Sequence, residues 1–240
     1  MVHDDYKLLI LGGTSSLGRA ILENSKILDF DVTATYRHDL LELKKKNHIT
    51  WFPLDIESKE SCHNFLKMYS FLNPDCVIFT IGKLSESTHD ISHLSILEQY
   101  LQTYAVNYPL LITQMAKMQE FRRQRLYFFN ISSRSALLGS YDSSYAVTKS
   151  VVHVLMKSLP KIYGNRLTCF NFVLGLIENS NMFKKMSEQE QQNHRDRAGG
   201  RLMKIEDCAD EIIEYMKSTM SYPAESQDTQ TDIAIGPQYL

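Results

Sequence analysis

The sequence lacks most of the features that would place the protein outside the cytosol or on a nucleic acid. No apolar run approaches the roughly 20 residues that span a bilayer. The first apolar run follows acidic residues and is too short for a signal peptide. A net charge of −2 gives no reason to expect nucleic acid or an anionic membrane as a partner. The few cysteines are far apart and form no CxxC pair, which favours reduced thiols over a disulfide framework or a zinc site; they are Cys62, Cys76, Cys169 and Cys208. We therefore expect a cytoplasmic protein that binds neither nucleic acid nor a membrane.

Internal repeats are also missing, as is any linker rich in proline, glycine or serine. The 240 residues suffice for one large domain with a sizeable core and are short for two. Apolar residues make up 43% of the chain and charged residues 22%, which is ordinary for a globular protein. A single domain over 1–240 is the expectation.

Short apolar runs alternate with longer amphipathic segments along the whole chain. The runs show no strict polar alternation, as is typical of strands buried on both faces. Strand and helix in regular succession, joined by right-handed crossovers, favour an α/β fold with a doubly wound parallel sheet of about seven strands and helices on both faces. The expected strands are 7–12, 31–36, 49–54, 75–82, 125–132, 166–175 and 231–236, and the expected helices are 17–28, 39–47, 57–70, 93–120, 144–163 and 205–220.

The first strand is followed by a turn with three glycines, in the sequence "LLILGGTSSLGRAIL". A doubly wound fold binds a dinucleotide at this place, where backbone N–H groups and a helix N-terminus face the pyrophosphate. Gly12 would allow the tight turn and Gly18 the close packing of helix on strand. Small polar residues lie between them: Thr14, Ser15 and Ser16. The alternative is a glycine-containing turn without a ligand.

The second expected strand ends in Tyr36, with Arg37 after it. A site for NAD would place a carboxylate here for the ribose hydroxyls, whereas a guanidinium suits the 2′-phosphate of NADP. NADP(H) is therefore favoured over NAD(H). The alternative is that Arg37 is a solvated charge opening a helix.

The stretch "SSYAVTK" contains Tyr145 and Lys149, which share one face of a helix at i and i+4. Such a pair proves little alone, but a set of polar residues precedes it in a fixed order. The fifth expected strand ends in "FFNISSRS", which brings Ser132 and Ser133 to the carboxyl edge of the sheet. Asn107 lies on the helix before.

These residues in this order resemble the short-chain dehydrogenases/reductases, and the similarity runs from the glycine turn to "RAGGRLMKIEDCADEI". The resemblance implies catalytic roles for Asn107, Ser133, Tyr145 and Lys149. It implies that Asp55 contacts adenine and that Gly175 and Ile177 lie along the nicotinamide. The full set that it implies for the cofactor is Gly12, Thr14, Ser15, Ser16, Leu17, Gly18, Tyr36, Arg37, Asp55, Ile56, Gly82, Tyr145, Lys149, Gly175 and Ile177.

Three positions depart from the family pattern. Ser16 replaces a glycine of the turn. The family's Asn-Asn-Ala-Gly after the fourth strand is here "FTIG", residues 79–82, which removes an asparagine that braces the sheet. Leu174 replaces a proline. None of these changes removes a reacting group.

The resemblance implies an NADP-dependent oxidoreductase that transfers a hydride between nicotinamide and a ketone or secondary alcohol. Tyr145 would donate the proton, Ser133 would hold the carbonyl oxygen, and Asn107 would hold a water linking Lys149 to solvent. A homodimer or homotetramer is implied as well. Two alternatives stay open: a catalytically idle NADP-binding sensor, and an epimerase or dehydratase with the same reacting residues.

Several other features have plain alternative explanations. The family places a substrate lid at about 179–201, and basic residues there would suit an anionic substrate such as a nucleotide-linked sugar or a carrier-bound acyl group. A solvated helix explains them equally well; the basic residues are Lys184, Lys185, His194, Arg195, Arg197 and Arg201. His89 and His93 have no third metal ligand nearby, so no metal site is expected. A stripe of Tyr100, Tyr104 and Tyr108 is more typical of core or subunit contact than of a substrate pocket.

Overall fold

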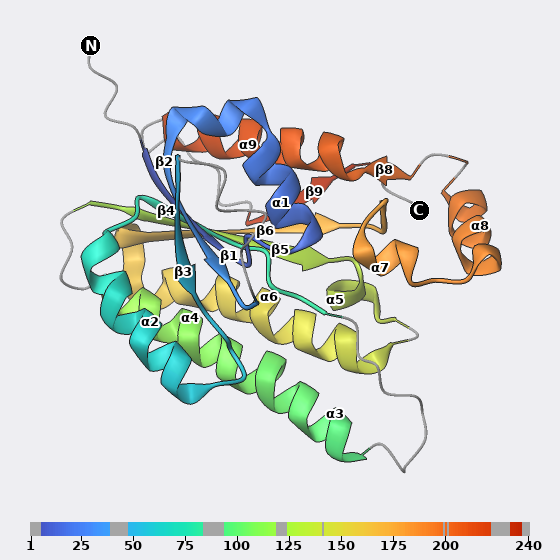
Figure 1. The fold of residues 1–240 in the computed structure, drawn as a ribbon, viewed down its shortest axis with the longest axis horizontal. Coiled ribbons are helices and arrows are strands. Elements are labelled where there is room, and N and C mark those ends of the chain that lie inside the picture. Colours follow the sequence, from blue (N-terminus) through green and yellow to red (C-terminus); the bar gives the residue numbers. More distant parts are fainter. Residues whose placement is uncertain are drawn as a thin grey trace.

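The computed structural model of the chain describes residues 6–38, 48–83, 94–118, 124–140, 142–198, 200, 202–221 and 231–236. A seven-stranded, fully parallel sheet forms its centre, in the order β3-β2-β1-β4-β5-β6-β9 (Figure 1). The order reverses direction between β1 and β4, which is where doubly wound sheets bind ligands. The strands are β1 (Tyr6–Leu11), β2 (Phe30–Tyr36), β3 (Ile49–Pro53), β4 (Cys76–Phe79), β5 (Leu126–Ser133), β6 (Leu167–Leu174) and β9 (Asp232–Ile235). The predicted fold class is confirmed.

Helices cover both faces of this sheet (Figure 1). On one face lie α1 (Ser16–Glu23) and α9 (Ile205–Ser221), and on the other α2 (Lys59–Leu72), α4 (Tyr108–Lys117) and α6 (Ser143–Tyr163). Neighbouring residues of a strand point to opposite faces. Thus Phe129 packs in the core under α9 while Phe128 packs in the core under α4 and α6. Burial on both faces explains why the apolar runs show no alternation.

The helix expected over 93–120 is interrupted by a wider turn. Its described part consists of α3 (Leu94–Leu101), a π-helical turn over Gln102–Asn107, and α4. Within the turn the Tyr108 amide donates to the Thr103 carbonyl, five residues back. Pro109 follows at the start of α4 and has no N–H to donate, so the regular hydrogen-bond ladder cannot continue through it. The prediction of one continuous helix over 93–120 is therefore wrong at Gln102–Asn107.

Two other predicted helices differ from the structure. The helix expected at 17–28 ends at Glu23, because Asn24 caps a separate 3-10 helix over Ser25–Asp29. The one expected at 39–47 lies outside the described residues.

The segment expected to be a lid has structure that periodicity did not predict. After β6 come β7 (Ile177–Glu178), α7 (Asn181–Lys184), α8 (Glu188–Arg197) and β8 (Met203–Lys204). β7 and β8 pair as a separate parallel two-stranded sheet, and in Figure 1 α7 and α8 project beside the carboxyl edge of the main sheet. Another short helix, α5 (Ser135–Leu138), follows β5. Within the described part of the chain, no helix is both long and apolar enough to cross a bilayer.

Candidate active site

The glycine turn between β1 and α1 has the tight geometry that its sequence predicts. Gly12 has a φ of 92°, which favours glycine, and a β-carbon there would lie 2.9 Å from side-chain atoms of Thr80 and Ile81. A β-carbon on Gly18 would lie 2.4 Å from the Gly12 carbonyl oxygen. Only glycine fits at either position, so the backbone of the turn is free to approach a ligand.

Thr80, at the end of β4, braces this turn. Its hydroxyl lies 2.8 Å from the Gly12 carbonyl oxygen and 2.9 Å from that of Leu11. The Ser15 hydroxyl in turn donates to the Thr80 oxygen over 3.1 Å. In the sequence this segment stands out only for its missing asparagine, yet the threonine beside that position ties β4 to the glycine turn.

The N-terminus of α1 can receive a phosphate. Ser15 caps the helix and accepts from the Gly18 amide over 3.0 Å, while Leu17 is buried beneath the turn. Ser16, which replaces a family glycine, accepts from the Asn181 amide over 3.0 Å and so joins the turn to α7. Backbone amides at a helix N-terminus attract anions.

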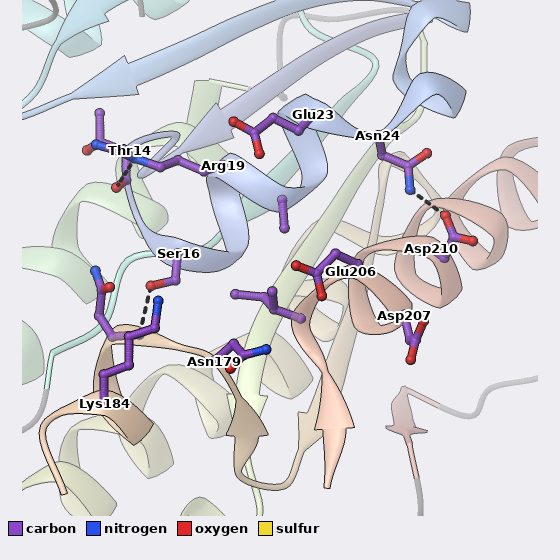
Figure 2. A pocket seen from close by; sticks show the side chains of 13 residues that line it. Thr14, Ser16, Arg19, Glu23, Asn24, Asn179, Lys184, Glu206, Asp207 and Asp210 are labelled. Atoms are coloured by element: carbon purple, nitrogen blue, oxygen red, sulfur yellow. Dashed lines mark hydrogen bonds between the residues drawn. The ribbon is translucent and has the colours of Figure 1, made fainter. Parts of the chain in front are cut away.

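A hollow of about 630 Å³ adjoins this turn between α1, α7 and the start of α9. Figure 2 shows Thr14, Ser16 and Lys184 at one end of it and acidic side chains of α9 at the other. The acidic end, with Glu206 and Asp207, would repel a phosphate. An anion is therefore favoured only at the end formed by the glycine turn.

The reacting pair predicted from "SSYAVTK" meets Ser133 in the structure. Asp142 caps α6 by accepting from the Tyr145 amide over 2.9 Å. Burial raises the pKa of Tyr145, and a hydrogen bond with the Ser133 side chain lowers it. Ser133 is the last residue of β5. Ser132 points elsewhere: it is buried and its hydroxyl lies 2.8 Å from His153 Nδ1, so Ser133 is the serine of this site.

Lys149 lies one helical turn after Tyr145, with its Nζ 5.9 Å from the centre of the Tyr145 ring. Its ammonium donates to the Ile131 carbonyl over 2.9 Å. Burial lowers the pKa of Lys149 to about 8. A β-carbon on Gly82 would lie 2.9 Å from the same Nζ, so a side chain at this position would make the lysine shift.

The Asn107 side chain is bonded to other groups, and the role expected for this residue, to hold a water beside Lys149, stays a prediction. Its amide nitrogen donates to the Ile56 carbonyl over 3.3 Å, and its oxygen accepts from Gln102 over 3.1 Å. The cavity beside Lys149 is lined instead by Tyr104 and Tyr108. The π-helical turn ends at Asn107 and so helps to set the direction of this side chain.

Arg37 forms an ion-pair cluster at the other end of the sheet edge. Its Nε lies 3.2 Å from an Asp55 oxygen and its terminal nitrogen 2.6 Å from Glu57. Tyr36 packs against Trp51, with ring centres 6.5 Å apart. A guanidinium is thus present where the sequence suggested one for a 2′-phosphate, but two carboxylates already contact it. Glu57 was missed in the sequence, although it lies two residues after Asp55.

The residues expected along the nicotinamide follow the end of β6. Leu174, which replaces the family proline, is buried, and its carbonyl accepts from the Arg134 amide over 2.9 Å. Gly175 continues the chain toward β7, where Ile177 packs partly buried against the core. The departure at Leu174 therefore leaves the strand end in place.

No group of three metal-ligating side chains occurs among the described residues. His89 and His93 lie outside the described residues. All four cysteines are unpaired.

Comparison with known proteins gives matches at the level of structure. No protein-family model matches the chain, and no curated protein matches it in sequence. A short-chain type dehydrogenase/reductase from Mycobacterium ulcerans superposes with a TM-score of 0.74 and 19% identity, over 96% of this chain and 87% of that chain. Sorbitol-6-phosphate 2-dehydrogenase SrlD from Erwinia amylovora gives 0.74 and 17%, over 95% and 96%. A variant of ElxO with NADPH bound gives 0.70 and 18%, over 96% of each chain. The resemblance seen in the sequence is thus confirmed in three dimensions: the chain has the fold of the short-chain dehydrogenases/reductases.

Proposed function

We propose that the protein is an oxidoreductase of the short-chain dehydrogenase/reductase type that interconverts a ketone and a secondary alcohol. The observation that carries this proposal is that the Ser133 side chain lies close enough to Tyr145 to lower its pKa, with Lys149 one helical turn away, at the sheet edge that also holds the glycine turn. A bound nicotinamide would supply or accept the hydride. The residues present fit such a cofactor, because glycines leave the backbone of the turn open to it and Gly82 leaves room for the lysine.

The three side chains divide the proton chemistry between them. Tyr145 is protonated at neutral pH, since the ordinary pKa of tyrosine is near 10 and burial raises it further, and the protonated form is the one needed to donate to a carbonyl oxygen. Ser133 would hold the same oxygen and stabilise the charge that develops on it. The Lys149 ammonium favours the phenolate once the proton has left. Its pKa of about 8 lets it exchange a proton near neutral pH.

NADP(H) is the proposed cofactor in preference to NAD(H). Arg37 would contact the 2′-phosphate, Asp55 the adenine, and the first turn of α1 the pyrophosphate. A structure of similar fold contains NADPH. Asp55 and Glu57 now pair with Arg37, so the phosphate would have to replace at least one of these contacts.

The substrate is proposed to be a small carbonyl compound or alcohol. The case for an anionic substrate is narrower than the sequence suggested, because Arg195 of α8 pairs with Glu178 over 3.0 Å and lies over the Phe183 ring. Lys184 of α7 is the exposed lid cation beside the glycine turn. The side chains of Arg197 and Arg201 lie outside what the structure describes. An anionic group on the substrate would therefore meet Lys184 first.

A homodimer or homotetramer, working in the cytoplasm as a single domain with a lid over 179–201, completes the proposal. One sheet contains strands from both ends of the chain, β1 and β9 among them, which supports a single domain. Free thiols suit a reducing compartment. Apolar side chains lie exposed on α4 and α6, including Leu110 at 55%, Val147 at 50% and Val154 at 59%. Exposed apolar side chains on these two helices support contact with a second copy of the chain.

A second candidate function is an NADP-binding sensor without catalysis. The observation in its favour is that the Asn107 side chain does not face Lys149. Turnover separates the two functions.

The experiment is to mix the protein with NADPH and a panel of ketones and to follow cofactor fluorescence and absorbance. Turnover that falls about a thousandfold in Tyr145→Phe, with NADPH binding kept, supports the enzyme. Tight NADPH binding with no turnover of any carbonyl supports the sensor. Absence of both overturns the proposal.

A further inference from the structure

A row of polar side chains crosses the sheet beneath α6, where a parallel sheet usually packs apolar residues. Asn130 of β5, Asn171 of β6 and Asp232 of β9 are register partners on neighbouring strands. The Asn130 amide donates to the Asn171 oxygen over 2.8 Å, and the Asn171 amide donates to Asp232 over 3.2 Å. Both asparagines are buried. Burial of polar groups costs stability unless each is satisfied, and the chemistry proposed for Tyr145 does not use this row.

His153 of α6 lies over the row. Its Nδ1 is 2.8 Å from the Ser132 hydroxyl, and its Nε2 is 3.4 Å from an Asp232 carboxylate oxygen. The imidazole is 3% exposed and Ser132 is 2% exposed, so neither contact is shared with solvent. Among the described residues, Nε2 makes no hydrogen bond, which leaves Asp232 as its charge contact. The Asn171 amide also donates to the His153 carbonyl over 3.2 Å.

The neutral imidazole fits this environment better than the charged one. With its proton on Nε2, facing Asp232, the ring accepts from the Ser132 hydroxyl at Nδ1. A second proton would lie on Nδ1 and reverse that hydrogen bond, so Ser132 would become the acceptor. Its own hydrogen would then need a new acceptor in a buried site, and within the described part of the chain the hydroxyl contacts only His153.

Charges on two elements act on the ring in opposite directions. Asp232 on β9 favours protonation, whereas Lys157 on α6 opposes it and is itself paired with Asp232. The other strands packed here contribute neutral groups, Ser132 from β5 and Asn171 from β6. Burial outweighs the carboxylate and lowers the pKa of His153 below its ordinary 6.5. The ring is therefore neutral at neutral pH and gains a charge only in acid.

The contact with Ser132 holds the end of the strand that carries the reacting serine. Lys149 and His153 are one helical turn apart on α6, and they bind consecutive residues of β5. The Lys149 ammonium donates to the Ile131 carbonyl, and the His153 ring contacts the Ser132 hydroxyl. Ser133 is the next residue. If the histidine contact is lost, the lysine alone ties this strand end to the helix.

We propose that His153 is a pH-dependent positioning residue: the neutral ring fixes the end of β5 at Ser133, and protonation in mild acid releases it. The change at the ring rests on the geometry of its contacts, whereas its effect on the reaction rests on the proposed function. Tyr145 and Lys149 both stay protonated below pH 7, because their pKa values lie above it. A loss of carbonyl reduction in mild acid would therefore not come from the reacting pair.

The protonation can be measured without any substrate. In long-range ¹H–¹⁵N NMR spectra we expect His153 to carry its proton on Nε2 at neutral pH and to have a lower pKa than His63, an exposed histidine of α2. Chemical denaturation should show the wild type losing stability from about pH 7.5 to about pH 5.5, because the unfolded chain then binds more protons than the folded one. His153→Asn can still hydrogen-bond Ser132 but cannot titrate, so it should lose less. A His153 that titrates like His63, or that carries its proton on Nδ1 at neutral pH, overturns the proposal.

Kinetics at saturating NADPH test the effect on the reaction. We expect kcat to fall about fivefold from about pH 7.5 to about pH 5.5 in the wild type and to stay level in His153→Asn. Ser132→Ala should lower kcat at both pH values and also remove the acid loss. The matched control, His63→Asn, should keep the wild-type profile. A level profile in the wild type, or an unchanged acid loss in His153→Asn, overturns the positioning role. Failure of the wild type to reduce any carbonyl would instead overturn the proposed function, and the NMR measurement would still decide the protonation of His153.

Discussion

Different forces hold the residues in place at the two ends of the carboxyl edge of the sheet. At the reacting end, Tyr145 is buried and Lys149 half-buried on α6, and the Lys149 ammonium donates to the Ile131 carbonyl of β5. At the other end, Arg37, Asp55 and Glu57 are held by ion pairs whose side chains are about one-third exposed. Packing fixes the first arrangement, while water and salt weaken the second. We therefore expect the fixed positions of Tyr145 and Lys149 to determine the reaction. The exposed charges around Arg37 should determine which cofactor binds.

Lys149→Met tests the reacting end and has the largest expected effect. Removal of the ammonium should lower carbonyl reduction at least about a hundredfold, because it favours the phenolate of Tyr145. Retention of activity within about threefold would remove Lys149 from the mechanism.

The same variant has an expected pH signature in stability. The folded pKa of Lys149 is lowered from 10.5 to about 8, so between pH 8 and 10.5 the unfolded chain binds more protons than the folded one. The lowered pKa therefore destabilises the folded wild type. This loss of stability is complete below pH 8 and disappears as the pH rises toward 10.5. Chemical denaturation should show Lys149→Met more stable than the wild type at pH 7, with a difference that shrinks by pH 10. A constant difference would mean that the ammonium is well solvated.

Arg37→Ala tests the other end. Loss of a charge-assisted contact worth about 1.5–3 kcal/mol should weaken NADPH binding about 10- to 100-fold, with NADH binding much less changed. Asp55 and Glu57 would also be left without their counter-charge and would repel a phosphate. The control is Lys59→Ala, which removes an exposed charge at the start of α2. Equal loss for both cofactors would contradict the 2′-phosphate role and can be measured by fluorescence titration.

Thr80→Val probes the brace shared by both ends. Its hydroxyl bonds carbonyls of the glycine turn from within a buried position, and an isosteric valine cannot replace them. The free energy of unfolding should fall by about 1–2 kcal/mol, and affinity for both cofactors should fall together. Thr113→Val, which removes a hydroxyl bonded locally to Pro109 within α4, is the matched control. If Thr80→Val is as stable as Thr113→Val, the glycine turn does not need the Thr80 hydroxyl to keep its conformation.

Elements fixed by burial could be predicted from the sequence, and those fixed by single contacts could not. Apolar runs buried on both faces identified all seven strands of the main sheet, and the i, i+4 spacing on α6 placed Tyr145 and Lys149 on one side. The direction of Asn107 was not predictable in this way. It depends on a π-helical turn, and an extra residue in a helix rotates all later side chains by about 100°. No sequence pattern identifies Thr80 or Glu57, because each acts through only one or two contacts with another segment of the chain.

Glu57→Gln has the smallest expected effect and separates the two ends most sharply. The carboxylate competes with a 2′-phosphate for Arg37, and its neutral amide analogue of the same shape competes less. NADPH affinity should rise about threefold at low salt, with NADH affinity unchanged, and the gain should shrink as salt screens this partly exposed pair. Glu60→Gln, an exposed change in the first turn of α2, should leave the ratio of the two affinities alone. Tighter binding of both cofactors would show that Glu57 acts through general charge repulsion. Weaker binding of NADPH would show that Glu57 orients Arg37 for the phosphate, in which case the exposed end of the crevice is as preorganised as the buried one.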